Sequence, residues 1–323
     1  MVNNDYKYTV RVACKTYNHA LFIKDALNGF CMQQTTFPFV CTIFDDDSCD
    51  GTPEVITAFL SEQFDLCSLK TCRQEETDHY RLIFAQHNIN KNCFFAVFLL
   101  KYNHFNIKKS IRPYMAEWYD NSKYVAVCEG DDYWIDPNKL QKQVDFMEEH
   151  PNHSLCVHAY RREEYKDNSI VSMDVHKYQK NVEILPDKDV ICNMGLLAAT
   201  ASMLYRADAV VDMPTWKKNA PVGDRSLQLV LFGRGHISYI DEVMSVYRIG
   251  VPGSWSKRVL FSHKKNLPLT RDFRNMMADF DNWSNLRYHS LVRKARRGYL
   301  WLFIKRELLE FKSSIVYLLK KRR

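Results

Sequence analysis

Short apolar runs alternate with helical patterns from the N-terminus to about Pro137. Runs rich in β-branched and aromatic residues predict strands, and segments with apolar residues three or four apart predict helices. Strands are predicted at Tyr8–Cys14, Phe39–Asp46, Arg81–Gln86 and Lys123–Glu129, and helices at about His19–Cys31, from Asp50 onward, at Asn92–Leu100 and at Arg112–Trp118. This order is typical of a doubly wound α/β fold with a mainly parallel central sheet flanked by helices.

The pattern changes after Pro137. Helices are predicted at Asn138–His150 and Asp224–Gly235, and strands at Ser154–Arg161 and within His236–Arg248. Between them, Arg161–Pro186 is polar and has no clear period. No internal repeat or low-complexity linker interrupts the chain, so we predict one α/β domain over residues 1–255 and a helical C-terminal extension over residues 256–323.

The last part of the chain is strongly basic. Residues 287–323 hold 12 Lys and Arg against two acidic residues, while the whole chain has a net charge of +7. A basic amphipathic helix of this kind fits an anionic membrane surface, and the alternative is a helix packed on the domain with a solvated basic face. No nucleic-acid-binding module is recognised, so nucleic acid is not an expected partner. The apolar positions, three or four apart, are Leu300, Ile304, Leu308, Phe311, Ile315 and Leu319.

The cysteines and the lengths of the apolar runs indicate in which cell compartment the protein is expected. The 10 cysteines form no C-x-x-C pair, which favours reduced thiols over a disulfide frame or a zinc site. No run reaches the roughly 18 apolar residues of a membrane-spanning helix. The opening MVNNDYKYTVRVAC lacks the basic and apolar regions of a signal peptide, so we expect a cytoplasmic protein.

Two acidic clusters directly follow predicted strands, FDDDSCDGT at Phe44–Thr52 and CEGDDYW at Cys128–Trp134. Side chains alternate along a strand, so Glu129 and Asp131 share a face at the carboxyl end, where open α/β sheets bind ligands. Crowded carboxylates repel, and protonation, basic partners or a divalent cation relieves the repulsion. Oxygen ligands suit Mg²⁺ or Mn²⁺. Either cluster alone is also explained as a solvated turn or helix cap.

Three ordered blocks resemble glycosyltransferase family 2, the inverting nucleotide-sugar enzymes of the GT-A fold. VACKTYNHALFIKDALNGFCMQQTTFPFVCTIFDDDSCDGT is similar to the opening of that family, and VCEGDDYWIDPNKLQKQVDFM to its metal-binding D-x-D region. GDRSLQLVLFGRGHISYIDEVMSVYR is similar to the downstream segment that carries the catalytic base. The blocks cover about Val10 to Arg248, and their resemblance implies a Rossmann-like GT-A fold.

The resemblance also implies roles for residues of the first two blocks. Mn²⁺ or Mg²⁺ would be held on the donor diphosphate by Asp131 and Asp132, with help from Glu129. The implied donor-binding positions are Thr16, Tyr17 and Asn18 for the nucleoside, Asp45 and Asp46 for the base and ribose, and Glu129, Gly130 and Asp131 near the diphosphate. Tyr17 and Asn18 are also explained as a plain turn and helix start.

The third block implies the base. Asp224 would take the proton from the acceptor hydroxyl, although an Asp in this place is also a common helix cap. Gly223 stands where many relatives have an acidic neighbour of the base. Many relatives also have a His soon after the Tyr-Arg pair; here Arg248 or Lys257 would contact phosphate instead. Trp134 is a candidate for the acceptor region, with core packing as its alternative.

The implied function is transfer of a sugar, with inversion, from a nucleotide-sugar to a glycan or lipid-linked acceptor. A UDP-sugar is the expected donor, and the family implies bacterial cell-surface polysaccharide or lipopolysaccharide assembly. One alternative is a sugar nucleotidyltransferase, which shares the sheet, the metal and the nucleotide but releases pyrophosphate. Another is a non-catalytic module that binds a nucleotide or a membrane.

Overall fold

The computed structural model describes residues 6–119, 121–166, 169–178, 182–193, 197–251 and 263–320, with the backbone alone in 263–267 and 306–320. The predicted domain boundary at residue 255 and the candidate Lys257 lie outside these ranges.

One mixed sheet of 11 strands runs through the described residues in the order β3-β4-β5-β2-β1-β6-β10-β8-β11-β7, with β9 paired to β8. Its central strands β5, β2, β1 and β6 are parallel. The predicted α/β class, with a parallel central sheet, flanking helices and a helical C-terminal segment, is therefore confirmed. The strands are β1 (Tyr8–Thr16), β2 (Phe39–Asp45), β3 (Arg73–Glu76), β4 (Tyr80–Gln86), β5 (Cys93–Leu100), β6 (Ser122–Val127), β7 (Tyr133–Trp134), β8 (His153–Lys166), β9 (Ser169–His176), β10 (Leu204–Arg206) and β11 (His236–Ile249).

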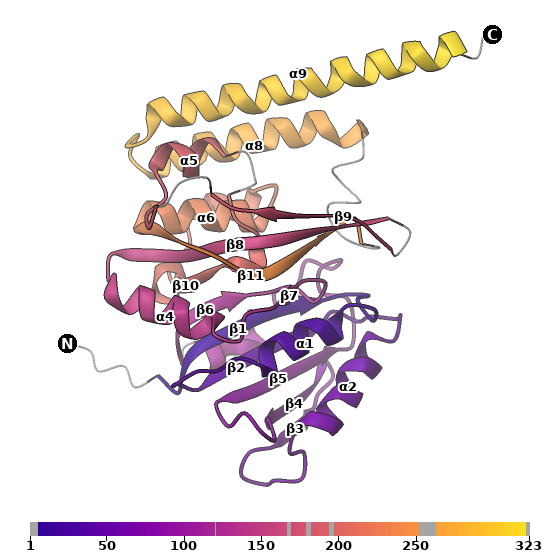
Figure 1. Cartoon of the computed structure of the whole chain (residues 1–323), viewed down its shortest axis with the longest axis vertical. Coiled ribbons are helices and arrows are strands. Elements are labelled where there is room, and N and C mark those ends of the chain that lie inside the picture. The colour runs from indigo at the N-terminus through magenta and orange to yellow at the C-terminus, as the bar shows by residue number, and fades with distance from the viewer. Residues whose placement is uncertain are drawn as a thin grey trace.

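Helices cover both halves of this sheet (Figure 1). Helices α1 and α2 lie on the N-terminal half, while α5, α6, α8 and α9 stack above the half that contains β8 and β11, with α9 outermost. The helices are α1 (Ile23–Cys31), α2 (Thr52–Gln63), α3 (Ala116–Tyr119), α4 (Lys139–Glu149), α5 (Asp187–Cys192), α6 (Gly223–Arg234), α8 (His263–Trp283) and α9 (His289–Lys320), with short 3₁₀ turns at Arg112–Met115, Thr200–Ser202, Asp208–Val210 and Thr215–Asn219.

The helix predicted at Asn92–Leu100 is wrong, because this segment forms strand β5. Its sequence CFFAVFLL is almost continuously apolar and is buried along most of its length. A central strand covered on both faces needs apolar residues at every position, so it loses the alternation that identifies a strand. Strand β4 pairs with it antiparallel, which replaces the expected third parallel crossover by an antiparallel pair.

The polar stretch Arg161–Pro186 contains structure that its pattern did not indicate. Strand β8 extends through it to Lys166, and β9 returns antiparallel alongside. Strand β9 is solvent-exposed along nearly its whole length. A strand without a buried face has no alternation to detect, so the polar composition gave no strand signal.

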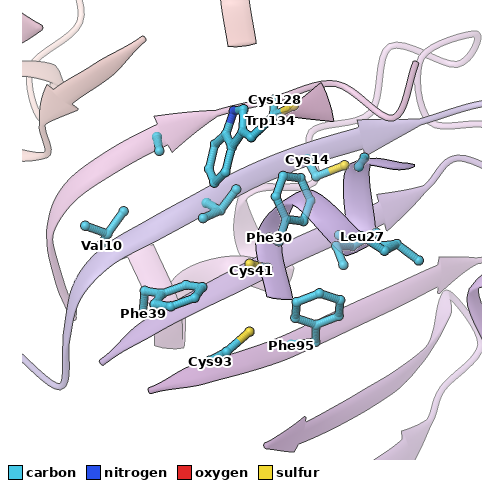
Figure 2. Close-up of a cluster of buried hydrophobic side chains, with 14 of the residues drawn as sticks. Val10, Cys14, Leu27, Phe30, Phe39, Cys41, Cys93, Phe95, Cys128 and Trp134 are labelled. Atoms are coloured by element: carbon cyan, nitrogen blue, oxygen red, sulfur yellow. The ribbon is translucent and has the colours of Figure 1, made fainter. Parts of the chain in front are cut away.

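Two large cores lie on opposite faces of the sheet. The first packs α1 and α4 onto the central strands; Phe30 contacts Trp134 and Phe95 edge-on, with ring centroids 4.9 and 6.3 Å away (Figure 2). The second core joins β8 and β11 to α6, α8 and the start of α9. The carboxyl ends of the central strands therefore meet at an edge supported from both faces.

Candidate functional site

The turn after β1 is fixed to the loop after β2. Asn18 adopts a left-handed backbone with φ 56°, which Asn tolerates better than most residues. Its N–H donates to Ser48 Oγ at 2.8 Å, and its Oδ1 accepts the Cys49 N–H at 3.0 Å. The N–H of His19 donates to Thr52 Oγ1 at 2.9 Å. Hydrogen bonds thus fix the Thr16 ledge, which is the segment Thr16–Asn18 predicted to hold the nucleoside.

Thr16 and Tyr17 lie on this ledge in different environments. Thr16 ends β1 and is buried, with its Oγ1 3.2 Å from His19 Nδ1. Tyr17 is 39% exposed, so its ring remains available to a ligand. Burial lowers the pKa of His19, while the negative charge of Asp131, 3.8 Å from its Nε2, acts in the opposite direction.

The two acids at the end of β2 differ in how their oxygens are used. Asp46 accepts the main-chain N–H groups of His104 at 2.7 Å and Phe105 at 3.1 Å. Asp45 is 1% exposed; its Oδ2 accepts the Ser48 N–H, and its buried Oδ1 has no hydrogen-bond partner among the described residues. Burial raises the pKa of Asp45. Asp45 therefore keeps a polar atom free, whereas Asp46 shapes the neighbouring loop.

The acidic turn after β6 is pressed against the end of β1. The Gly130 N–H donates to the Lys15 carbonyl at 2.9 Å, and the Asp132 N–H closes the turn onto the Glu129 carbonyl at 3.1 Å. A Cβ on Gly130 would lie 2.5 Å from Thr16 Oγ1. Only glycine permits this approach, so the absence of a side chain at Gly130 allows the Glu129–Asp132 turn to lie against the Thr16 ledge.

The carboxylates of this turn repel one another. Glu129 keeps contact with solvent; partial loss of water around its carboxyl, followed by the charge of Asp131, raises its pKa to about 7. Asp132 is buried, and burial followed by the charge of Asp131 raises its pKa. A divalent cation or a cationic ligand group would relieve this repulsion.

Arg248 supports the turn from inside the protein. It is 5% exposed; its N–H donates to Asp132 Oδ1 at 2.8 Å, and its Nη1 donates to the Asp131 carbonyl at 3.1 Å. Its Nη2 pairs with Asp25 of α1, and its guanidinium lies 4.3 Å from the centre of the Tyr133 ring. Arg248, a predicted phosphate contact, is thus buried behind the acidic turn and holds the turn in place.

Asp224 lies in the first turn of α6 with its side chain exposed. The cap position of α6 belongs to Val222 and has no side-chain cap bond; Asp224 Oδ1 accepts the N–H of the adjacent Arg225 at 2.6 Å. The charge of Asp224 helps to raise the pKa of Glu129 and of Tyr247, which places it within electrostatic reach of the acidic turn.

Trp134 belongs to the core, which corrects its assignment to the acceptor region. It is 2% exposed, its Nε1 donates to the Ala201 carbonyl at 2.9 Å, and Lys139 Nζ lies 4.1 Å from its ring centre. An indole enclosed in this way has no face to offer a sugar. The large volume of Trp makes such a core role common near a site.

The structure adds four residues that the motifs did not single out: Lys15, His19, Lys217 and Tyr247. The charge of Lys15 lowers the pKa of Glu129, and burial followed by the charge of Lys15 lowers the pKa of Lys217. Burial, then the charge of Asp132, raises the pKa of Tyr247. Lys15 and His19 flank the predicted Thr16–Asn18 segment, which was the available signal, whereas Lys217 has no motif around it.

The described residues offer few side-chain ligands for a metal ion. Among the described ranges, no three His, Cys, Asp or Glu side chains form a ready set of metal ligands. Glu129 and Asp131 nevertheless supply hard oxygen donors, which fit Mg²⁺ or Mn²⁺ held mainly between a carboxylate and a ligand's phosphates. Asp132 already gives one oxygen to Arg248, so Asp131 is the more available carboxylate.

These observations define an α/β protein with a cluster of carboxylates at the carboxyl edge of parallel strands. Among solved structures, TarS 1-349 of S. aureus in complex with UDP-GlcNAc is similar with a TM-score of 0.53 and 14% identity, over 90% of this chain and 71% of that one. The mannosyltransferase PcManGT from Pyrobaculum calidifontis, in complex with GDP-Man and Mn²⁺, gives 0.49 and 10% identity over 96% and 81%. The likeness to TarS shows a shared fold.

No protein-family model matches the chain. Proteins of Mycobacterium tuberculosis and Mycobacterium bovis, both named only as uncharacterized proteins, are 28% identical over 243 residues. The match covers 74% of this chain and 58% of each relative, so the chain spans little more than half the length of these curated relatives. In the part of the chain that is described, no helix is both long and apolar enough to cross a bilayer.

Proposed function

We propose that the protein is a glycosyltransferase of the family 2 type, which moves a sugar from a nucleotide-sugar to a glycan or lipid-linked acceptor. The observation that carries the proposal is the Glu129–Asp132 turn, held against the Thr16 ledge with Asp224 within electrostatic reach. The shared fold with TarS, whose structure holds UDP-GlcNAc, supports a UDP-sugar as donor. A cytoplasmic role in bacterial surface polysaccharide or lipopolysaccharide assembly is part of the same proposal.

Donor binding would use both strand ends. Tyr17 is exposed beside the braced turn at Asn18, and Asp45 Oδ1 is a buried acceptor that a nucleoside N–H or hydroxyl can satisfy. Asp131 is the proposed principal metal ligand, with Glu129 beside it and Asp132 fixing the turn. When bound, Mn²⁺ or Mg²⁺ offsets negative charge on the departing nucleoside diphosphate. Lys15 and Lys217 would add positive charge at the edge of the donor site.

Asp224 is the proposed general base. It accepts the proton of an acceptor hydroxyl while that oxygen bonds to the anomeric carbon from the face opposite the diphosphate. The bond from the anomeric carbon to the phosphate oxygen breaks, so the configuration inverts. Because Asp224 is exposed and Val222 holds the cap position, an acceptor hydroxyl can reach its carboxylate, of which Oδ1 also accepts the Arg225 N–H.

Arg248 is proposed to position the acidic turn and not to contact the donor. Its guanidinium is engaged with Asp25, the Asp131 carbonyl and the Tyr133 ring. An arginine that held phosphate would need its guanidinium donors directed into the ligand site. Arg248 instead ties β11 to α1 behind the carboxylates.

Nucleotide binding with and without metal tests the proposal. Calorimetry with UDP should give tight binding with Mn²⁺ or Mg²⁺, weak binding in EDTA, and almost none for Asp131→Ala, because this change removes a charged ligand from a site with few others. Asp145→Ala, an exposed acid on α4, is the matched control. Equal affinity in EDTA would remove the metal from the proposal.

Product analysis separates the alternatives. Incubation with a panel of nucleotide-sugars should release a nucleoside diphosphate. Release of pyrophosphate from a nucleoside triphosphate and a sugar phosphate would instead identify a nucleotidyltransferase. Binding without turnover of any donor would favour the non-catalytic module.

A further inference from the structure

A cavity of about 440 Å³ lies between the sheet and α5. It is lined by side chains from β9 and the segment after it, from α5, and from β11. None of the residues assigned above to donor, metal or base lines it. The lining residues used here are His176, Lys177, Tyr178, Lys188, Asp189 and Tyr239.

The cavity wall is fixed to the helix that carries the proposed base. Arg225, next to Asp224, is 2% exposed, and its Nη2 donates to the carbonyls of Val190 at 2.7 Å and Ile191 at 3.0 Å. Both carbonyls belong to α5, the helix that contributes Lys188 and Asp189 to the cavity. A ligand in the cavity therefore lies against the same short helix that anchors the start of α6.

A row of aromatic rings connects the other side of the cavity to the acidic turn. The ring of His176 lies 4.8 Å from that of Tyr160, which lies 6.2 Å from Tyr247. Asp132 and Glu129 act electrostatically on Tyr247. Packed side chains of β8, β9 and β11 thus link the cavity to the acidic turn.

The lining chemistry is that of a site for an anionic sugar. The tyrosines Tyr178 and Tyr239 combine flat apolar rings with hydroxyl groups, and the Tyr178 hydroxyl is fixed to Asp189. Two lysines, Lys177 and Lys188, are exposed at the opening of the cavity, and among the described residues that line it Asp189 is the one carboxylate. Lys177 Nζ also lies 3.6 Å from Asp241, so Lys188 is the better candidate to contact an anion.

We propose that this cavity binds the acceptor, and that the acceptor end is a sugar unit bearing a phosphate or a carboxylate. The proposal rests on the proposed function, because it assigns the second substrate of that reaction. It requires the anionic group to lie at Lys188, with the sugar ring against Tyr178 and Tyr239.

Ligand-observed NMR can test this without turnover. The probes are glucose 1-phosphate, glucuronic acid and neutral glucose, each measured with and without UDP. We expect one or both anionic probes to bind and glucose to bind more weakly. Lys188→Glu should weaken anionic binding about tenfold or more, because an attraction becomes a repulsion, while Lys188→Arg should retain it. Lys91→Glu, an exposed lysine outside the cavity, is the control.

The outcomes separate this inference from the proposed function. Binding of UDP is measured on the same samples. If UDP binds but no sugar probe does, or if glucose binds as well as the anionic probes, or if Lys188→Glu binds like wild type, the cavity is not an anionic acceptor site and the donor proposal stands. If the anionic probes bind as expected while UDP does not, the donor proposal fails instead. A preference between phosphate and carboxylate identifies the acidic group.

Discussion

Asp224 is the residue at which a catalytic account and a structural account of the site differ most. Asp224→Asn keeps the shape and the hydrogen bond to the Arg225 N–H but removes the basicity. A general base contributes about 10²–10⁴-fold to rate, so kcat for sugar transfer should fall at least about 100-fold with donor affinity little changed. Transfer rate and thermal midpoint are measured together.

Asp187→Asn is the matched control for this change, because Asp187 is an exposed acid at the start of α5. It should leave both quantities near their wild-type values. Near-normal turnover in Asp224→Asn would return Asp224 to a structural role in the first turn of α6.

Gly130 allows a second test with a single methyl group. Gly130→Ala places a Cβ 2.5 Å from Thr16 Oγ1, so the acidic turn or the ledge must shift. Overpacking of this kind costs about 1–3 kcal/mol. We expect a lower urea midpoint and weaker UDP binding in calorimetry.

Gly223→Ala is the control for Gly130→Ala, since a Cβ at Gly223 meets nothing within 4 Å. Its stability and UDP affinity should be close to those of wild type. If Gly130→Ala behaved in the same way, the close approach of the turn and the ledge would not matter for binding.

The sequence predicted those residues of the site that follow a strand directly, because a strand end fixes where the next side chains lie. The acidic clusters with Asp45 and Asp131 were predicted in this way, whereas Thr16 came from the family resemblance. The partner of Arg248 was not predictable, because Asp25 is brought to it only by the packing of α1 beside β11. Lys217 was missed for the same reason: its approach to Lys15 is purely tertiary.

At the scale of elements, a helix with one buried face was predicted well, and β2, although buried at every position, was predicted from its β-branched and aromatic residues. Helix α4 was found almost to its ends, because its apolar positions recur at helical spacing. Strand β5 is buried on both faces and β9 on neither, so both lack a readable period. The errors therefore fall at the two extremes of burial, where amphipathic alternation is lost.

Helix α9 divides into a packed part and an exposed part. Val292, Ala295 and Tyr299 are buried in the second core, whereas Trp301 is 59% and Ile304 46% exposed. The packed alternative thus describes the first turns of the helix. Membrane binding remains a prediction for the segment from Leu300 onward.

Deletion of Leu300–Arg323 should leave donor hydrolysis intact, because it begins after the last buried side chain described in α9. Each Lys or Arg near an anionic surface contributes about 1 kcal/mol, so flotation with anionic liposomes should drop strongly at low salt. The difference should fade as salt screens the charges. Full-length protein with neutral liposomes is the control, and unfolding of the truncated chain would favour packing over membrane docking.

At the scale of the whole molecule, the candidate site joins two differently built halves. Arg248 on β11 reaches Asp25 on α1, and Trp134 donates to Ala201, so contacts from both halves hold the acidic turn. The amino ends of β8 and β11 lie at the other end of the sheet. A cluster of histidines lies there, and protonation of its central member should change the free energy of unfolding.

His153, at the start of β8, is the centre of this group. Its ring lies 4.8 Å from that of His150 and 5.4 Å from that of His236. Burial, followed by the charges of these two neighbours, lowers the pKa of His153 to about 4. In the unfolded chain a histidine has a pKa near 6.5. Below that pH the unfolded state binds a proton that the folded state accepts only near pH 4.

The free energy of unfolding should therefore fall as the pH drops from about 6.5 towards 4, and His153 alone should contribute up to about 3 kcal/mol of that loss. Urea unfolding at several pH values between 8 and 5 measures the slope. His153→Asn removes the titrating group, so its slope below pH 6.5 should be shallower whatever its absolute stability. His79→Gln removes an exposed histidine and should keep the wild-type slope. Identical slopes for wild type and His153→Asn would mean that His153 titrates alike in the folded and unfolded chains, and that acid sensitivity arises elsewhere in the fold.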